Sequence, residues 1–115
     1  FKNLTVKTGY QAIQRFTENN KSFDGIVCAS DEIAMGAINA LREKGIKVPE
    51  DVSVIGFDNN VMGSIFYPKL TTISQPSYDM GSVAVRMLIK MLNKKELDNP
   101  NYVLNYELIK RESTK

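Results

Sequence analysis

The chain has 115 residues, of which 43% are hydrophobic and 24% are charged, and its formal net charge at pH 7 is +2. This size and composition are typical of one small soluble globular domain, and so small a net charge does not by itself indicate nucleic-acid binding. The lone cysteine, Cys28, excludes an intramolecular disulfide and favours a reducing, cytoplasmic location.

The sequence offers little for catalysis or for membrane insertion. Histidine, the commonest general base and metal ligand, is absent. No phosphate-binding loop, metal-spaced cluster or nucleophile paired with a base is visible, so an enzyme is the least favoured class and neither cofactor nor metal is expected. No apolar run is long enough to span a membrane, and no secretory signal is visible. Because the chain starts at Phe1 rather than methionine, we expect an excised piece.

The first residues predict an extended entry followed by a helix. Phe1–Val6 alternates weakly between apolar and polar residues, as a short strand does. Thr8, with Gln11 three residues later, matches a capping box. This pattern predicts a helix from about Gly9 to Glu18.

A strand–helix–strand unit follows. Gly25–Ala29 and Val52–Phe57 are near-continuous in apolar residues, the pattern of strands that are covered on both faces in parallel sheets. Between them, Ser30 is a favourable N-cap for a helix over Asp31–Lys44, and Gly45 is a stop signal. The two strands are therefore predicted to be parallel, with the helix as their crossover.

Polar residues come just past each predicted strand. Ser30 and Asp31 follow the first strand, Asp58 follows the second, and Gln75 follows a third candidate strand, Leu70–Ser74. In open α/β sheets, ligands bind at the carboxyl ends of the strands, and these side chains suit a polyol or a similar polar small molecule. A structural interpretation stays open for each residue. Spacing alone favours the structural interpretation for Asp31, which complements a helix dipole. For Asp58, spacing supports a ligand contact and a simple turn equally.

Three further segments carry unusually apolar surfaces. The helix after Ser30 has an apolar face wider than its own sheet requires, with Gly36 in mid-helix, where close packing is expected to offset a cost of about 1 kcal/mol. The segment Val61–Tyr67 is too apolar for a bare loop. Ser77–Asn93, with Ser77 as its cap, is the strongest predicted helix, and most of it is expected to be buried.

The end of the chain reads as two weak strands, over Tyr102–Leu104 and Glu107–Lys110, followed by a polar tail. On the helix Ser77–Asn93, the polar residues form one narrow stripe that includes Arg86 and Lys90 one turn apart. Such a stripe is usually only the solvated face, but two like charges one turn apart would suit an anionic partner.

Four motifs resemble the C-terminal part of LacI/GalR-family transcription regulators, in order and at the family's spacing. They are S-D-E-I-A-M-G-A, V-P-E-D-V-S-V-I-G-F-D-N, P-K-L-T-T-I-S-Q-P and the closing K-R-E-S-T. The resemblance implies a fragment of an α/β, periplasmic-binding-protein-like fold with a Rossmann-like parallel sheet. Residues 1–75 would be part of the C-terminal effector-binding lobe, and residues 76–106 a helix and strand of the N-terminal lobe. Residues 107–115 would be the return strand and tail, with the DNA-binding domain absent.

The resemblance also implies partners and site residues. A small-molecule effector, a sugar or sugar phosphate, would bind with Asp58 accepting hydrogen bonds from its hydroxyls, Ser30 and Asp31 at the rim, and Gln75 on the hinge side. Operator DNA would be bound only through the missing N-terminal domain. The chain would form a homodimer through six apolar residues, of which Met35 is equally well explained as core: Met35, Ile38, Met62, Ile65, Phe66 and Tyr67.

Within Ser77–Asn93, the sequence resembles the corresponding helix of the catabolite control protein of Gram-positive bacteria. There, matching positions touch the serine-phosphorylated phosphocarrier protein HPr. The resemblance therefore implies a co-regulator surface formed by Tyr78, Asp79, Arg86 and Lys90.

Two function classes follow from these patterns. The first is the effector-sensing and dimerisation part of a transcription regulator, in particular a repressor of carbohydrate-utilisation genes. The second is the C-terminal lobe of a periplasmic sugar-binding protein of the same ancestral fold. The L-T-T-I-x-Q-P run and the K-R-E-S-T ending favour the regulator.

Overall fold

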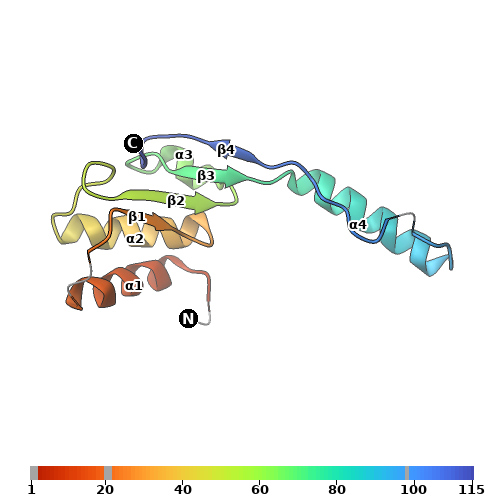
Figure 1. Ribbon diagram of the computed structural model, residues 1–115, viewed down its shortest axis with the longest axis horizontal. Coiled ribbons are helices and arrows are strands. Elements are labelled where there is room, and N and C mark those ends of the chain that lie inside the picture. The colour runs from red at the N-terminus through yellow and green to blue at the C-terminus, as the bar shows by residue number, and fades with distance from the viewer. Residues whose placement is uncertain (1–2, 20–21, 98) are drawn as a thin grey trace. The chain divides into compact units, whose positions relative to one another are not determined.

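The computed structural model describes residues 3–19, 22–97 and 99–115. This part of the chain forms two compact units, one comprising the residues up to Ser74 together with Leu108–Lys115 and the other Gln75–Glu107. These limits lie within one residue of those expected from the sequence, while the assignment of the units to two lobes stays a prediction. The elements, labelled in Figure 1, are α1 (Val6–Glu18), β1 (Gly25–Val27), α2 (Asp31–Glu43), β2 (Ser53–Phe57), α3 (Val61–Ile65), β3 (Thr71–Ser74), α4 (Ser77–Leu92) and β4 (Glu107–Ile109).

The described strands form one sheet in the order β1-β2-β3-β4. β1 pairs parallel with β2, and β2 pairs parallel with β3, which confirms the predicted architecture. β1 ends two residues earlier than expected, although the Cys28 amide still donates to the Ile55 carbonyl at 2.8 Å. The carboxyl ends of these three parallel strands consequently meet at one edge of the sheet.

The start of α1 differs from the sequence prediction. Thr5 is the N-cap, and its Oγ1 accepts a hydrogen bond from the Thr8 amide at 3.3 Å. Val6, expected in a strand, is the first helical residue, while Phe1 and Lys2 lie outside the described residues. The expected cap at Thr8 is wrong because Thr5 supplies a competent acceptor three residues earlier.

Two glycines let α1 and α2 approach closely. A Cβ on Gly36 would lie 1.9 Å from the carbonyl oxygen of Val6, and a Cβ on Gly9 would lie 2.0 Å from that of Ile33. Backbone touches backbone at this crossing, so no side chain can rotate away to make room. The expectation that close packing explains the mid-helix Gly36 is confirmed, and α1 and α2 lie side by side in Figure 1.

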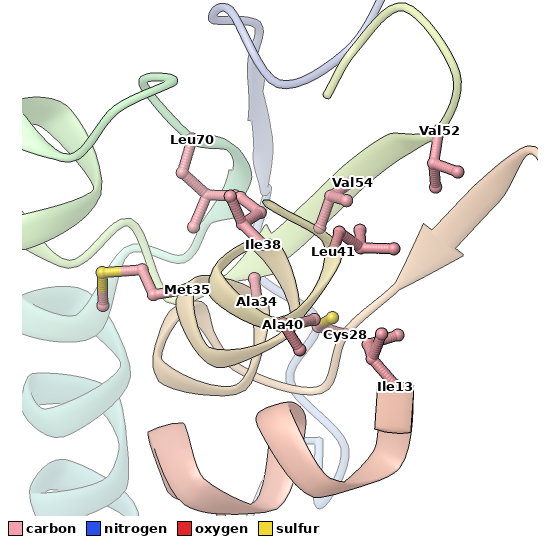
Figure 2. Close-up of a cluster of buried hydrophobic side chains, with 11 residues drawn as sticks. Ile13, Cys28, Ala34, Met35, Ile38, Ala40, Leu41, Val52, Val54 and Leu70 are labelled. Atoms are coloured by element: carbon pink, nitrogen blue, oxygen red, sulfur yellow. The ribbon is translucent and has the colours of Figure 1, made fainter. Parts of the chain in front are cut away.

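The core of the first unit lies between α2 and the sheet. Figure 2 shows Ile38 and Leu41 of α2 beside Val54 of β2 and Leu70. Met35 and Ile38 are 7% and 1% exposed, so the structure places them in this core. The structure thus favours the core interpretation that the sequence left open for Met35, and it gives Ile38, expected at a dimer interface, a core position as well.

The apolar segment after β2 is a short helix rather than a loop. Asn60 caps α3, its Oδ1 accepting from the Met62 amide at 2.9 Å. Met62, Ile65 and Tyr67 are 50%, 71% and 77% exposed, so they keep the open apolar surface expected of an interface. Phe66 is half-buried against the core, with the Arg42 guanidinium 6.0 Å from its ring centroid.

In the second unit, no residue of α4 is buried. Ser77 is the first helical residue and Pro76 holds the N-cap position without a side-chain bond, so the expected serine cap is wrong. Tyr102–Leu104, expected as a weak strand, is not a strand in the structure. The expectation that most of this helix is buried is wrong for the described residues, which leave every residue of α4 at least partly exposed. No helix in the described ranges has both the length and the apolarity to cross a membrane.

The C-terminal residues, expected to be a polar tail, are joined to the sheet. Ser113 is fully buried: its Oγ donates to the Val54 carbonyl at 2.6 Å and accepts from the Thr71 amide at 2.8 Å. The Val54 amide donates to the Ser113 carbonyl at 2.8 Å. The end of the chain thus connects β2 to the residues that begin β3.

Gly36→Ala is expected to destabilise the first unit strongly, by about 1–3 kcal/mol or more, because the new methyl group overlaps backbone and forces α1 away from α2. Gly81→Ala is the matched control, since Gly81 also lies within a helix and no described atom lies within 4 Å of the added Cβ. That change should stabilise α4 by up to about 1 kcal/mol. Urea unfolding followed by circular dichroism measures both, and equal effects would contradict the close crossing.

The chain is expected to be dimeric or larger in solution. α4 exposes at least half of several large apolar side chains, and burying each one fully is worth roughly 1.5–3 kcal/mol. Sedimentation at micromolar concentration measures the association, and Leu88→Glu should weaken it because a charge cannot enter an apolar contact cheaply. A folded monomer would show that α4 needs no cover from a second copy. The residues concerned are Val85, Leu88, Ile89, Met91 and Leu92.

Candidate functional site

The turn after β2 carries the exposed carboxylate of Asp58. Asp58 has φ +104° and Asn59 has φ +53°, two consecutive non-glycine residues in a region that L-residues rarely adopt. Such conformations cost on the order of 1–3 kcal/mol each and persist where surrounding contacts hold them. The Asp58 amide donates to the Ile73 carbonyl of β3 at 3.0 Å, which fixes the turn to the neighbouring strand.

Asp31 is buried directly behind this turn. It is 1% exposed, and its two carboxylate oxygens accept from the Thr72 hydroxyl and from the Asn60 amide, each at 2.6 Å. A buried charge is tolerated only where it is paired or hydrogen-bonded, and here the N-terminus of α2 adds a favourable dipole. The carboxylate joins α2, the turn after β2 and β3 at one point.

Gly56 in β2 makes room for this buried carboxylate. A Cβ on Gly56 would lie 2.2 Å from Asp31 Oδ1. Any other residue at position 56 would displace the oxygen that accepts from Thr72. The glycine in the strand is therefore explained by the acidic residue at the start of α2.

The charge on Asp31 also affects Cys28. Burial, and secondarily the negative charge of Asp31, raises the pKa of the Cys28 thiol to about 11. The thiol is consequently protonated near neutral pH. Because the thiolate is the reactive form, Cys28 is not a candidate nucleophile.

Thr72 and Arg111 extend the network on the other side of the turn. The backbone amide of Asn59 donates to Thr72 Oγ1 at 3.3 Å, so the Thr72 hydroxyl accepts from Asn59 and donates to Asp31. Arg111 donates through Nη2 to Asn59 Oδ1 at 2.7 Å and through Nη1 to the Leu70 carbonyl at 2.8 Å. Through these contacts, both β3 and the C-terminal segment fix the turn after β2.

The four candidate ligand residues differ in exposure and in hydrogen bonding. Ser30 is 6% exposed and caps α2, accepting from the Ile33 amide at 3.3 Å. Asp31 has an internal structural role, the interpretation that spacing favours. Asp58 presents its side chain to solvent, and Gln75 is half-buried at the start of the second unit. Of the two candidate carboxylates in the first unit, Asp58 is therefore exposed and Asp31 is buried.

Sequence reasoning missed two residues of this site, Thr72 and Arg111. Both threonines of β3, Thr71 and Thr72, are buried, and buried hydroxyls in a parallel strand signal internal partners. The arginine of K-R-E-S-T gives no comparable local signal. Its partner Asn59 lies 52 positions away in the chain.

The described residues form a further cavity but no metal centre. Across the described ranges, no group of three or more acidic, cysteine or histidine side chains could hold a metal ion. A separate cavity of about 450 Å³ lies between α1, β1 and α2, lined mainly by apolar residues such as Ile13, Phe16 and Phe23. That lining does not suit a polyol, so the edge at Asp58 stays the candidate site.

The chain is similar to known proteins over nearly its whole length. Residues 3–114 match the family model described as a periplasmic binding protein-like domain. The chain is 69% identical over 111 residues to the HTH-type transcriptional regulator RegA of Clostridium saccharobutylicum, covering 96% of this chain and 33% of that protein.

Two solved structures resemble the chain closely. The transcription regulator CcpA of Lactococcus lactis matches with a TM-score of 0.86 and 35% identity, over 98% of this chain and 41% of that one. The lac repressor dimer bound to operator and the anti-inducer ONPF matches with a TM-score of 0.88 and 29% identity, over 96% of this chain and 38% of that one. The chain spans about a third of the length of the curated relative.

Asp31→Ala is expected to lower the free energy of unfolding by about 2–4 kcal/mol, because it removes the acceptor of the buried Thr72 hydroxyl and of the part-buried Asn60 amide. Glu32→Ala is the control: Glu32 is also acidic and in the first turn of α2, but it is exposed, so its loss should cost less than about 1 kcal/mol. Chemical denaturation compares the two. Similar losses would mean that Asp31 acts only through the helix dipole.

Proposed function

The chain belongs to the family of periplasmic binding protein-like domains, and on that premise we propose that it is the effector-sensing part of a LacI-type transcription regulator. The observation that carries the proposal is the exposed Asp58 carboxylate at the carboxyl edge of a parallel sheet. Ligands bind at this edge in open α/β folds. The relatives reported above carry the names of transcription regulators, which supports a regulatory role over an enzymatic one.

The effector we propose is a sugar or a sugar phosphate. A carboxylate accepts hydrogen bonds from neighbouring hydroxyls and gives charge-assisted bonds roughly twice as strong as neutral ones. Asp58 is therefore the principal ligand residue of the proposal, with Ser30 as a weaker neighbour. Gln75 keeps its predicted role on the resemblance of the L-T-T-I-S-Q-P run, and Asp31 acts behind the site by holding the turn.

The regulator would repress carbohydrate-utilisation genes as a cytoplasmic homodimer. The lac repressor structure that resembles this chain is a dimer bound to operator DNA, and the relative RegA is described as HTH-type. DNA contact would come from a segment outside this chain. For dimerisation we retain the residues with exposed side chains, Met62, Ile65 and Tyr67, together with the adjoining Phe66.

A second proposed surface lies on α4. Tyr78, Asp79 and Arg86 are exposed and Lys90 is half-buried. A depression of about 180 Å³ is lined by Arg86, Lys90 and Tyr102 among others. Two cations one turn apart beside a depression suit an anionic partner, which supports serine-phosphorylated HPr as a co-regulator.

The second candidate function is a periplasmic sugar-binding protein. The description of the matching family model favours it, because that description names periplasmic binding proteins. It predicts the same contact between Asp58 and a ligand. The two functions differ in whether ligand binding changes affinity for DNA.

Asp58→Ala, introduced into the complete regulator that carries this chain, is expected to weaken effector binding about 5- to 150-fold, because ligand hydroxyls lose their charged acceptor. Calorimetry with D-glucose, D-ribose, glucose 6-phosphate and fructose 1,6-bisphosphate measures the affinity, and operator binding measures the response. Ser30→Ala should have a smaller effect, since a neutral hydroxyl makes weaker bonds.

Asp24→Ala serves as the control, because Asp24 is exposed just before β1, at the opposite end of that strand from Ser30. This variant should bind as the unaltered protein does. Undiminished effector affinity in Asp58→Ala would remove Asp58 from the binding site.

A further inference from the structure

Asn59, which adjoins Asp58, makes two side-chain hydrogen bonds of opposite polarity. Its Oδ1 accepts from Arg111 Nη2 at 2.7 Å, and its Nδ2 donates to Ser74 Oγ at 3.3 Å. Because a guanidinium can only donate, the carbonyl oxygen must face Arg111, and the amide then has a single orientation that satisfies both partners. The side chain is therefore fixed at both ends.

The two partners of Asn59 lie where the chain leaves and re-enters the first unit. Ser74 ends β3, and the chain then passes into the second unit at Gln75. Arg111 lies just after the point of return at Leu108. One side chain thus ties the turn after β2 to both connections between the units.

Arg111 is itself anchored to the start of β3. Its backbone amide donates to Thr71 Oγ1 at 2.9 Å, and its Nη1 donates to the Leu70 carbonyl at 2.8 Å. Hydrogen bonds from a charged donor are roughly twice as strong as neutral ones. Asn59 is consequently bonded to a fixed point of the sheet rather than to a loose chain end.

We propose that Asn59 is a positioning residue for Asp58. By bonding Arg111 and Ser74, Asn59 holds Asp58 in its positive-φ conformation. The inference rests on the proposed function, because that function makes Asp58 the residue that contacts the effector. A turn residue alone would need only the tolerance of asparagine for positive φ, and neither side-chain bond.

The test separates these two roles with Asn59→Gly. Glycine keeps the left-handed conformation at no steric cost, but it removes both side-chain bonds. Amide hydrogen exchange of the 115-residue chain under native conditions reports local opening at Asp58, whose amide bonds the Ile73 carbonyl. The Cys28 amide, bonded to Ile55, is the internal reference, and Asn19→Gly at the end of α1 is the matched control.

In Asn59→Gly, exchange at Asp58 is expected to accelerate about tenfold, while Cys28 is unchanged. Asn19→Gly should change neither amide. Arg111→Lys keeps the charge but replaces the two separate Nη donors by one ammonium, so it should weaken the bond to Asn59 and accelerate exchange at Asp58 to a smaller extent. Equal acceleration of both amides in Asn59→Gly would make Asn59 merely stabilising, and no acceleration would make it only a turn residue. Either result overturns the proposal.

This measurement needs no ligand, so its result can contradict the role of Asn59 without contradicting the proposed function. Suppose that exchange at Asp58 accelerates in Asn59→Gly but the effector response is unchanged in Asp58→Ala. That result would refute the binding role of Asp58 and keep the positioning role of Asn59. A lost effector response in Asp58→Ala with unchanged exchange in Asn59→Gly would do the reverse.

Discussion

The first unit depends on one buried negative charge, the carboxylate of Asp31. Its desolvation would be costly, and that cost is offset only because the Thr72 hydroxyl and the Asn60 amide point at its two oxygens. The need to bond this carboxylate constrains two elements. The helix α2 must begin where Asp31 can reach β3, and β2 must have glycine at position 56, where a side chain would overlap the carboxylate. A single side chain thereby sets the relation between a helix, a turn and two strands.

The same requirement explains how an unfavourable turn is kept. Two successive positive φ values at Asp58 and Asn59 would relax in an isolated peptide. Here the residue after them is bonded to Asp31, the first is bonded to β3, and the second is held by Arg111. Asp58 itself is exposed, while the two residues after it are bonded to Arg111 and Asp31. The exposed carboxylate of Asp58 and the buried carboxylate of Asp31 are thus linked through one turn.

The sequence predicts the sheet well because apolar runs and turn residues are local signals. β1, β2, β3 and α2 lie where the Ile- and Val-rich runs and the Ser30 cap place them. Local signals fail where two residues are equally competent, as Thr5 and Thr8 are for capping α1. Local signals also do not indicate how deeply a residue is buried, so spacing alone could not show that Asp31 is buried while Asp58 is exposed. The partners of Thr72 and Arg111 lie 41 and 52 positions away, beyond any periodicity.

Amide hydrogen exchange at Asn60 tests the role of Asp31 most directly. The Asn60 amide donates to the buried Asp31 oxygen, although it lies in a turn where amides usually exchange rapidly. If the Asp31 carboxylate holds this turn, the Asn60 amide should exchange about as slowly as the Val54 amide of β2, which is bonded to Ser113. Exchange at the rate of an exposed loop amide, with Val54 still protected, would contradict the claim that the Asp31 carboxylate organises the site.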